Sequence, residues 1–353
     1  MTYSVTIALD AMGGDKAPDA VVAGANIARK RHPEVRFVFF GDAKLIEPRL
    51  RRFKSLAKVA RVVNAPEVVA ADARPSQVVR TGRDTSMWKA VEAVRDGAAD
   101  GVVSAGNTGA LMAAAMFTLR TLPDIDRPAI AGFMPSLRGE TVLLDLGANV
   151  KCDARNLVQF AVMGEVYCRT LLGAQEPKVA LLNVGTEETK GNEILKEAAE
   201  ILAAADLPVT FCGFVEGDDI TAGTVDVIVT DGFTGNVALK TVEGAAKLIG
   251  QYIRQSFRSS LMAGIGYLFA RRAFAKMRRR TDPRRYNGAM LLGLNGICVK
   301  SHGGTDALGF ATAIGVAVDM VRNDANELIA EHLGKVDLGP TRGSEPAIKV
   351  ASS

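Results

Sequence analysis

The sequence predicts an α/β protein: a doubly wound, mostly parallel sheet between two layers of helices, in a three-layer α/β/α arrangement. Short β-branched runs alternate with longer helical segments along the 353 residues. Several of these runs, such as residues 179–184 and 225–230, are mostly apolar. Continuous apolar runs are typical of strands that helices cover on both faces, and a repeated strand–helix–strand order favours parallel pairing.

Nine strands are expected from these runs, at residues 5–9, 35–40, 60–64, 101–104, 129–134, 142–145, 179–184, 209–213 and 225–230. Helical segments lie between or after them, at residues 18–31, 85–95, 110–119, 154–171, 193–205, 237–257 and 307–333. We expect one catalytic unit over residues 1–338, with an amphipathic helical hairpin inserted at 245–286. The Pro- and Gly-rich tail at 339–353 is expected to be flexible.

Composition and charge exclude several classes of protein. Hydrophobic residues make up 48% of the chain and charged residues 23%, which is ordinary for a globular protein. The chain has no apolar run of about 18 residues to span a membrane, and its start lacks the features of a signal peptide. The four cysteines form no CxxC pair, so we expect reduced, buried thiols and a cytoplasmic location.

Loops rich in Gly, Asn, Asp and Thr follow five of the expected strands. Ligands of open α/β sheets bind beyond the carboxyl ends of the strands, where glycine admits a close anion and helix N-termini present N–H groups. We therefore expect the five loops to converge on one crevice at one edge of the sheet. The loops contain DAMGGD (10–15), SAGNTGA (104–110), LDLGAN (144–149), NVGTEETKGNE (183–193) and DGFTGN (231–236).

A purely structural origin accounts for each loop taken alone. Asp-Gly, Gly-Asn and Gly-Gly are common turn sequences, and Asp10, Asp145 and Asp231 can serve as helix caps. The usual fingerprints GxGxxG after a strand, GxxxxGK[ST], HExxH and GxSxG are absent. A sixth segment, residues 293–304, places Lys300 and His302 between glycines, where they either bind an anion or form the turn after a surface strand.

In this order the six segments resemble the PlsX family, the acyl-carrier-protein:phosphate acyltransferases of bacterial phospholipid synthesis. The resemblance runs from about Leu9 to Gly303 and ends with GLNGICVKSHG at residues 293–303. At residues 287–290 the chain departs from the family pattern, with Asn-Gly-Ala-Met where a sequence closer to Gly-Gly-Ala-Pro is expected. The resemblance implies a homodimer and a fold similar to isocitrate and isopropylmalate dehydrogenases and to phosphotransacetylase.

The resemblance also implies that phosphate attacks an acyl-carrier-protein thioester, giving acyl phosphate for a membrane glycerol-3-phosphate acyltransferase. Phosphate is already a nucleophile near neutral pH, so no enzyme nucleophile or redox cofactor is needed, and no metal ligands are singled out. The general base stays unassigned. The expected catalytic residues are Lys190, Asp231, Asn236, Lys300 and His302. The expected substrate-binding residues are Asp10, Gly13, Gly14, Asp15, Gly106, Asn107, Thr108, Gly109, Asp145, Asn149, Asn183 and Glu187.

Residues 254–285 form a basic patch, with ten Lys and Arg residues against one acidic residue in a chain of net charge +4. Apolar positions at helical spacing predict two amphipathic helices joined by a glycine tip at 263–266. Such a hairpin packs on the globule, lies on an anionic membrane, or docks an acidic carrier protein; nucleic acid is not expected. The resemblance favours the carrier protein and peripheral attachment to the inner face of the cell membrane. The contact residues expected are Phe257, Leu261, Ile265, Leu268, Arg271 and Arg272.

Three other functions stay open from the sequence. A metal-dependent decarboxylating dehydrogenase would need a cluster of acidic ligands and a cofactor loop, whereas the chain shows only isolated strand-end aspartates. A phosphotransacetylase acting on acyl-CoA would share the chemistry without needing the basic hairpin. A non-catalytic scaffold would bind membrane or carrier protein without turnover.

Overall fold

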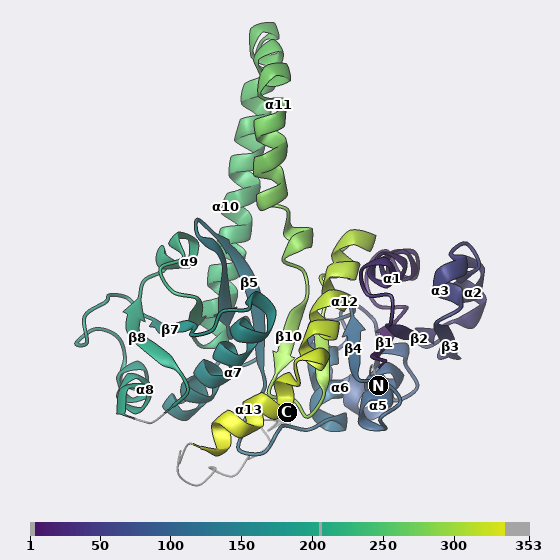
Figure 1. Ribbon diagram of the computed structural model, residues 1–353, viewed down its shortest axis with the longest axis horizontal. Coiled ribbons are helices and arrows are strands. Elements are labelled where there is room, and N and C mark those ends of the chain that lie inside the picture. Colours follow the sequence, from purple (N-terminus) through teal and green to yellow (C-terminus); the bar gives the residue numbers. More distant parts are fainter. Residues whose placement is uncertain (1–3, 205–206, 336–353) are drawn as a thin grey trace, which may run out of the picture.

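The computed structural model describes residues 4–204 and 207–335, so the tail predicted at 339–353 lies outside the described residues. One sheet of eleven strands runs through the body, in the order β3-β2-β1-β4-β11-β10-β5-β6-β9-β7-β8 (Figure 1). The strands are β1 (Thr6–Asp10), β2 (Arg36–Gly41), β3 (Ala60–Asn64), β4 (Gly101–Ser104), β5 (Ala129–Ser136), β6 (Gly139–Leu144), β7 (Lys178–Leu182), β8 (Thr210–Val215), β9 (Val227–Val229), β10 (Ala289–Leu292) and β11 (Ile297–Lys300).

Parallel pairing dominates the sheet, as predicted, but its two halves run in opposite directions. Neighbouring strands are parallel from β3 to β11 and again from β6 to β8. The pairs β11–β10, β10–β5 and β5–β6 between these blocks are antiparallel. All nine predicted strands are present. β10 is not among the predictions. β11 lies in the segment 293–304, for which a surface strand and turn was one interpretation, but the strand is buried between β4 and β10 rather than at the surface.

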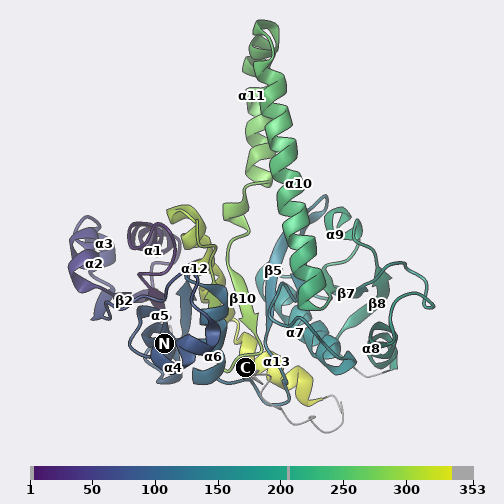
Figure 2. The same ribbon diagram turned by 180° about the vertical axis from the view of Figure 1, so that it is seen from behind.

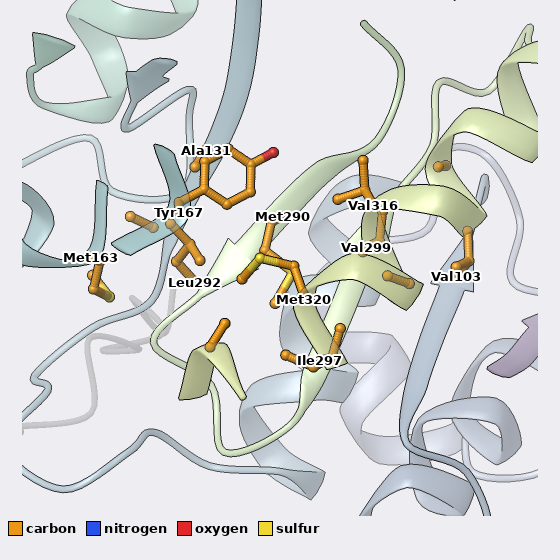
Figure 3. Packing of buried hydrophobic residues seen from close by; sticks show 14 of the residues in the cluster. Val103, Ala131, Met163, Tyr167, Met290, Leu292, Ile297, Val299, Val316 and Met320 are labelled. Atoms are coloured by element: carbon orange, nitrogen blue, oxygen red, sulfur yellow. The ribbon is translucent and has the colours of Figure 1, made fainter. Parts of the chain in front are cut away.

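Helices cover both faces of the sheet, which confirms the three layers. Two separate apolar cores result, because alternate strand residues point to opposite faces: Leu9 belongs to one core and Ala8 to the other. In Figure 3, Met290 and Val299 of the sheet lie near Met320 and Val316 in the first core. The first core holds side chains of α1 (Asp19–Arg31), α7 (Ala154–Leu172), α8 (Glu193–Ala204), α12 (Ala307–Arg322) and α13 (Ala325–Gly334), and the second those of α4 (Pro75–Thr81), α5 (Ser86–Arg95) and α6 (Thr108–Thr118).

A few local predictions are wrong. The helix expected at 307–333 is divided into α12 and α13, because Asp324 takes a left-handed conformation with φ of 48°. Cys212 is exposed rather than buried, because β8 is an edge strand, and Cys152 is only partly buried. The sequence also does not predict the short helices α2 (Ala43–Leu50), α3 (Lys54–Ala57), α4 and α9 (Asp219–Ala222).

Two long helices, α10 (Gly232–Arg258) and α11 (Leu261–Arg280), project side by side from the body (Figures 1 and 2). They are joined at Ser259 and Ser260 rather than at the predicted glycine tip, and Gly264 and Gly266 lie inside α11. The reason is a helix cap: Ser260 Oγ accepts the N–H of Ala263 at 3.1 Å. Within residues 4–204 and 207–335, no helix combines the length and apolarity needed to cross a bilayer.

Candidate active site

The strand-end loops occupy two opposite edges of the sheet. β1, β4 and β11 are parallel neighbours, so the loops after Asp10, Ser104 and Lys300 meet at one edge, which we call the Lys300 edge. β6, β9 and β7 are parallel neighbours that run the other way, so the loops after them meet at the opposite edge, which we call the Asp145 edge. The expectation of one crevice is therefore wrong for a single chain, because three antiparallel pairings reverse the sheet between the blocks.

The two edges are also separated sideways. Four strand spacings lie between β11, which carries Lys300, and β9, which leads to Asp231. Neighbouring strands are about 4.8 Å apart, so these residues are roughly 19 Å apart across the sheet. A single phosphate group cannot contact both residues within one chain.

Asp10 organises the Lys300 edge. Its side chain is buried, with 1% of the residue exposed, and accepts hydrogen bonds from Ser86 Oγ at 2.7 Å and Ser104 Oγ at 2.6 Å. Burial raises the pKa of Asp10, and the bonds from Ser104 and Ser86 oppose that rise. Asp10 therefore ties the ends of β1 and β4 to the start of α5. Neither serine is predicted from the sequence, although Ser104 ends a predicted strand, because only the fold brings both to Asp10.

Glycines let the loops of this edge pack closely. A Cβ on Gly13 would lie 2.4 Å from Asp10 Oδ2 and 2.7 Å from the N atom of Gly106. Gly14 has φ of +96°, which L side chains rarely adopt. The N–H of Asp15 donates to the carbonyl of Gly303 at 2.9 Å and so joins the β1 loop to the β11 loop. The three loops therefore form one continuous backbone surface.

Lys300 and His302 follow β11 at this edge. Burial lowers the pKa of Lys300 to about 8, while the charges of Asp10 and Asp15 act in the opposite direction. The Lys300 Nζ donates to the carbonyl of Ser301. His302 is exposed, and its Nδ1 accepts the N–H of Gly304 at 3.1 Å. An ammonium beside glycine-rich backbone suits an anion such as phosphate.

The N-terminus of α6 adds backbone donors to the Lys300 edge. Asn107 caps this helix by accepting the N–H of Ala110 at 2.9 Å, and its Nδ2 donates to the carbonyl of Ala71 at 2.7 Å. The Asn107 side chain is thus engaged within the protein. The first-turn N–H groups of Thr108 and Gly109 are the helix donors that suit an anion.

Asp145 organises the opposite edge. Its side chain is 0% exposed and accepts hydrogen bonds at 2.7–3.1 Å from the backbone N–H groups of Ile130, Gly147, Ala148 and Asn149 and from Asn149 Nδ2. Burial raises the pKa of Asp145, and these donors oppose that rise. The carboxylate of Asp145 is therefore engaged in shaping the loop of residues 145–149.

The other predicted residues of the Asp145 edge are divided between loop-forming and exposed side chains. Asp231 caps α10 by accepting the N–H and the hydroxyl of Thr234 at 2.9 and 2.8 Å. Asn183 accepts the N–H of Val184 at 2.8 Å and donates to the carbonyl of Lys190 at 3.3 Å. The exposed side chains, which are open to a ligand, are Glu187, Lys190 and Asn236.

Two surface hollows contain none of the predicted site residues. One, of about 240 Å³, is lined by Arg31, Glu140, Arg285 and Asp319 among others, and the second, of about 250 Å³, includes Arg169. In the described part of the chain, no three or more His, Cys, Asp or Glu side chains are grouped to hold a metal ion. The predicted anion-binding groups are most concentrated at the Lys300 edge, because three glycine-rich loops, the N-terminus of α6 and Lys300 lie there.

Comparisons with known proteins agree on one family. Residues 5–328 match the family model described as "Fatty acid synthesis protein". The chain is 62% identical over 336 residues to a protein named phosphate acyltransferase from Rhodospirillum centenum, covering 95% of each. It is 59% identical over 336 residues to the phosphate acyltransferase of Paramagnetospirillum magneticum, covering 95% of this chain and 96% of that protein.

Solved structures share the fold at much lower identity. A phosphotransacetylase from Streptococcus pyogenes aligns with a TM-score of 0.61 at 18% identity, over 91% of this chain and 94% of that one. A branched-chain phosphotransacylase from Enterococcus faecalis V583 aligns with a TM-score of 0.57 at 14% identity, over 90% of this chain and 99% of that one. At these identities the likeness shows the fold alone.

Proposed function

This chain belongs to the fatty acid synthesis protein family, and we propose on that premise that it is a phosphate acyltransferase whose donor is an acyl-carrier-protein thioester. The products are an acyl phosphate and free carrier protein. The observation that carries the proposal is the identity of 59–62% to proteins named phosphate acyltransferase over 95% of the chain. The predicted relation to the isocitrate and isopropylmalate dehydrogenase fold stays a prediction.

The Lys300 edge supports direct attack by phosphate on the thioester. Phosphate is anionic near neutral pH and needs no enzyme nucleophile. The first-turn N–H groups of α6 and the Lys300 ammonium hold the phosphate beside the thioester carbonyl. As a phosphate oxygen bonds to the carbonyl carbon, charge develops on the carbonyl oxygen, where His302 and backbone N–H groups donate. Collapse breaks the C–S bond, and the carrier thiolate leaves and takes up a proton.

The basic face of α11 favours carrier protein over coenzyme A as donor. Arg271 and Arg272 are exposed on this helix, and a basic face of this kind suits an acidic carrier. The test compares kcat/KM for the same acyl chain on carrier protein and on coenzyme A at saturating phosphate. We expect the carrier substrate to be favoured by about tenfold or more. An equal or higher kcat/KM with acyl-CoA would assign the chain to phosphotransacetylase-type chemistry instead.

A homodimer is part of the proposal. Four apolar side chains at the Asp145 edge are 50–78% exposed, as at surfaces that bind another chain: Val150 and Val184 on its loops, and Phe233 and Val237 at the start of α10. The predicted catalytic residues Lys190, Asp231 and Asn236 lie too far across the sheet from Lys300 to contact the same phosphate group. They contact that phosphate only if a second copy presents them.

Light scattering and mixing of inactive variants test this part of the proposal. We expect a dimer in solution, and partial recovery of activity when the inactive Lys190→Ala and Lys300→Ala proteins are unfolded and refolded together. A monomer, or no recovery in the mixed dimers, would contradict it.

The projecting helices are proposed to bind the anionic inner face of the cell membrane, where a glycerol-3-phosphate acyltransferase consumes the acyl phosphate. Leu261, Leu268 and Phe269 are 61–90% exposed, and Ile265 is about half exposed. Basic residues flanking exposed apolar side chains favour an interfacial position. Phe257 differs from the prediction: its ring packs against Tyr267 and Phe274, with centroids 5.5 and 4.9 Å away, inside the hairpin.

Replacing Leu261 and Phe269 together by serine is expected to weaken binding to phosphatidylglycerol vesicles by roughly 100-fold or more, because each side chain loses apolar burial worth about 1.5–3 kcal/mol. Vesicle cosedimentation measures the change. The control is Phe117→Ser, which removes an equally apolar, exposed side chain from the end of α6 and should bind vesicles as the wild type does. Unchanged binding by the double variant would remove these side chains from the membrane contact.

A further inference from the structure

The chain that returns from the projecting helices is tied directly to the loop beyond Lys300. Arg284, in η1 (Pro283–Arg285), donates from Nη2 to Asp282 Oδ2 at 2.7 Å and from Nη1 to Asp306 Oδ2 at 2.9 Å. Asp306 caps α12, where its Oδ1 accepts the N–H groups of Leu308 and Gly309 at 3.1 Å each. The guanidinium of Arg284 thus holds the start of α12 against the end of the projecting helices.

Asn287 fastens the same loop from inside the protein. Its Nδ2 donates to Ser301 Oγ at 2.8 Å and to the carbonyl of Gly309 at 2.7 Å, and its Oδ1 accepts the N–H of His302 at 2.9 Å. The carbonyl of Ser301 in turn accepts from Lys300 Nζ. Asn287 is buried, so its side chain does not face solvent. Its hydrogen bonds fix the backbone that carries Lys300 and His302.

We infer that Arg284 and Asn287 are positioning residues for acyl transfer, which hold the loop of residues 301–306 so that Lys300 and His302 face the phosphate. The inference rests on the proposed function of the Lys300 edge. Arg284 acts through its two carboxylate partners and Asn287 through the backbone of the loop, so neither is expected to contact substrate.

The exposure of the Arg284–Asp306 pair distinguishes a positioning role from a stabilising one. The two side chains are 42% and 40% exposed, and ion pairs this exposed contribute little to stability. Loss of the pair should therefore change the kinetics while leaving the unfolding midpoint unaltered. In the wild type, burial lowers the pKa of Lys300 to about 8, although the charges of Asp10 and Asp15 act in the opposite direction. A loosened loop would admit water to Lys300 and so reduce this effect of burial. The pKa of Lys300 should then rise toward its ordinary value.

The test compares the full-length Arg284→Gln protein with Arg95→Gln. Arg95 forms an exposed pair with Asp96, at 2.7 Å between Nε and Oδ1, where α5 ends. We expect Arg284→Gln to lower kcat by roughly 10- to 100-fold, as small misplacements of catalytic groups do, with the KM for acyl carrier protein unchanged. The fall in kcat that we expect for the wild type above pH about 8 should move to higher pH. Arg95→Gln should match the wild type in both respects.

Asn287→Asp is the second variant. It keeps the acceptor for the His302 N–H but loses the three Nδ2 donations, to Ser301, Thr305 and Gly309, so the same drop in kcat and the same shift of the pH profile are expected. The inference would be overturned if Arg284→Gln had the kcat and the pH profile of the wild type. It would also be overturned if Arg284→Gln and Arg95→Gln lowered kcat equally. If the wild-type protein itself releases no thiol in a phosphate-dependent way, the proposed function fails, which is a separate result from an active wild type with an unaffected Arg284→Gln.

Discussion

Replacing Lys300 by methionine is expected to lower kcat for acyl transfer to phosphate by about 100- to 1,000-fold, the usual cost of removing one group that stabilises developing charge. Methionine keeps a long apolar stem but lacks the ammonium that lies near Asp10 and Asp15. The KM for phosphate should also rise, because the ammonium attracts the bound anion before reaction. Steady-state kinetics with varied phosphate at saturating acyl donor measure both quantities.

The pH dependence of kcat follows from the pKa of the same lysine. Burial lowers this pKa to about 8, so the positive charge is present below that pH and is lost above it. Wild-type kcat is therefore expected to fall as the pH rises through about 8. Lys300→Arg should show no such fall, because a guanidinium stays protonated. The control is Lys335→Met, which removes an exposed lysine after α13 and should behave as the wild type. Full activity in Lys300→Met would exclude Lys300 from the mechanism.

Replacing Asp145 by asparagine is expected to destabilise the protein by about 2–4 kcal/mol, although the two side chains have the same shape. Asp145 Oδ2 accepts hydrogen bonds from Asn149 N at 2.7 Å and Asn149 Nδ2 at 3.0 Å, and Oδ1 accepts three more from backbone N–H groups. Whichever oxygen becomes an NH₂ group, buried donors would face another donor. Chemical denaturation measures the loss as a lower midpoint.

Asp153→Asn is the matched control for this substitution. Asp153 caps α7 by accepting the N–H of Asn156 at 2.9 Å, and asparagine caps helices as well as aspartate does. Its midpoint should therefore stay close to that of the wild type. If Asp145→Asn were as stable as Asp153→Asn, Asp145 would not be the residue that organises its edge of the sheet.

The layers of the fold could be predicted from the sequence because buried strands leave a strong signal. VALLNV at 179–184 is apolar on both faces, and the structure buries four of the five residues of β7 (Lys178–Leu182) between helices. β10 left a weaker signal, because its four residues, Ala-Met-Leu-Leu, include no β-branched or aromatic side chain. Alanine, methionine and leucine are as common in helices as in strands.

The convergence of the loops could not be predicted without the direction of each strand. Strands expected at 129–134 and 142–145 are separated by seven residues, which is too short for a crossover helix and indicates an antiparallel hairpin. That spacing was a usable signal for the reversal between β5 and β6. The antiparallel pairing of β10 with β5 gave no such signal, because it joins segments far apart in the chain. β10 and β11 are neighbours in the chain, but their hairpin could not be predicted because β10 itself was not among the predicted strands.

The side-chain networks of the site were predictable only in residue type. Asp10 was a candidate because it ends a strand, but its partners Ser86 and Ser104 lie 76 and 94 residues away in the sequence. Asn107 was expected to contact substrate, whereas its amide is used to cap α6 and to hold the Ala71 carbonyl. Sequence patterns give the polar residues at strand ends, and the fold decides which of them stay free for a ligand.

The central claim is that phosphate itself attacks the thioester at the Lys300 edge. The most direct measurement is a single turnover, with the enzyme in excess over a long-chain acyl carrier protein, with and without phosphate. Free thiol reports thioester cleavage, and hydroxylamine traps the acyl phosphate as a hydroxamate. We predict thiol release only when phosphate is present, in equal amount to the hydroxamate and strongly slowed in Lys300→Met. Thiol release without phosphate, or no release with it, would contradict the account.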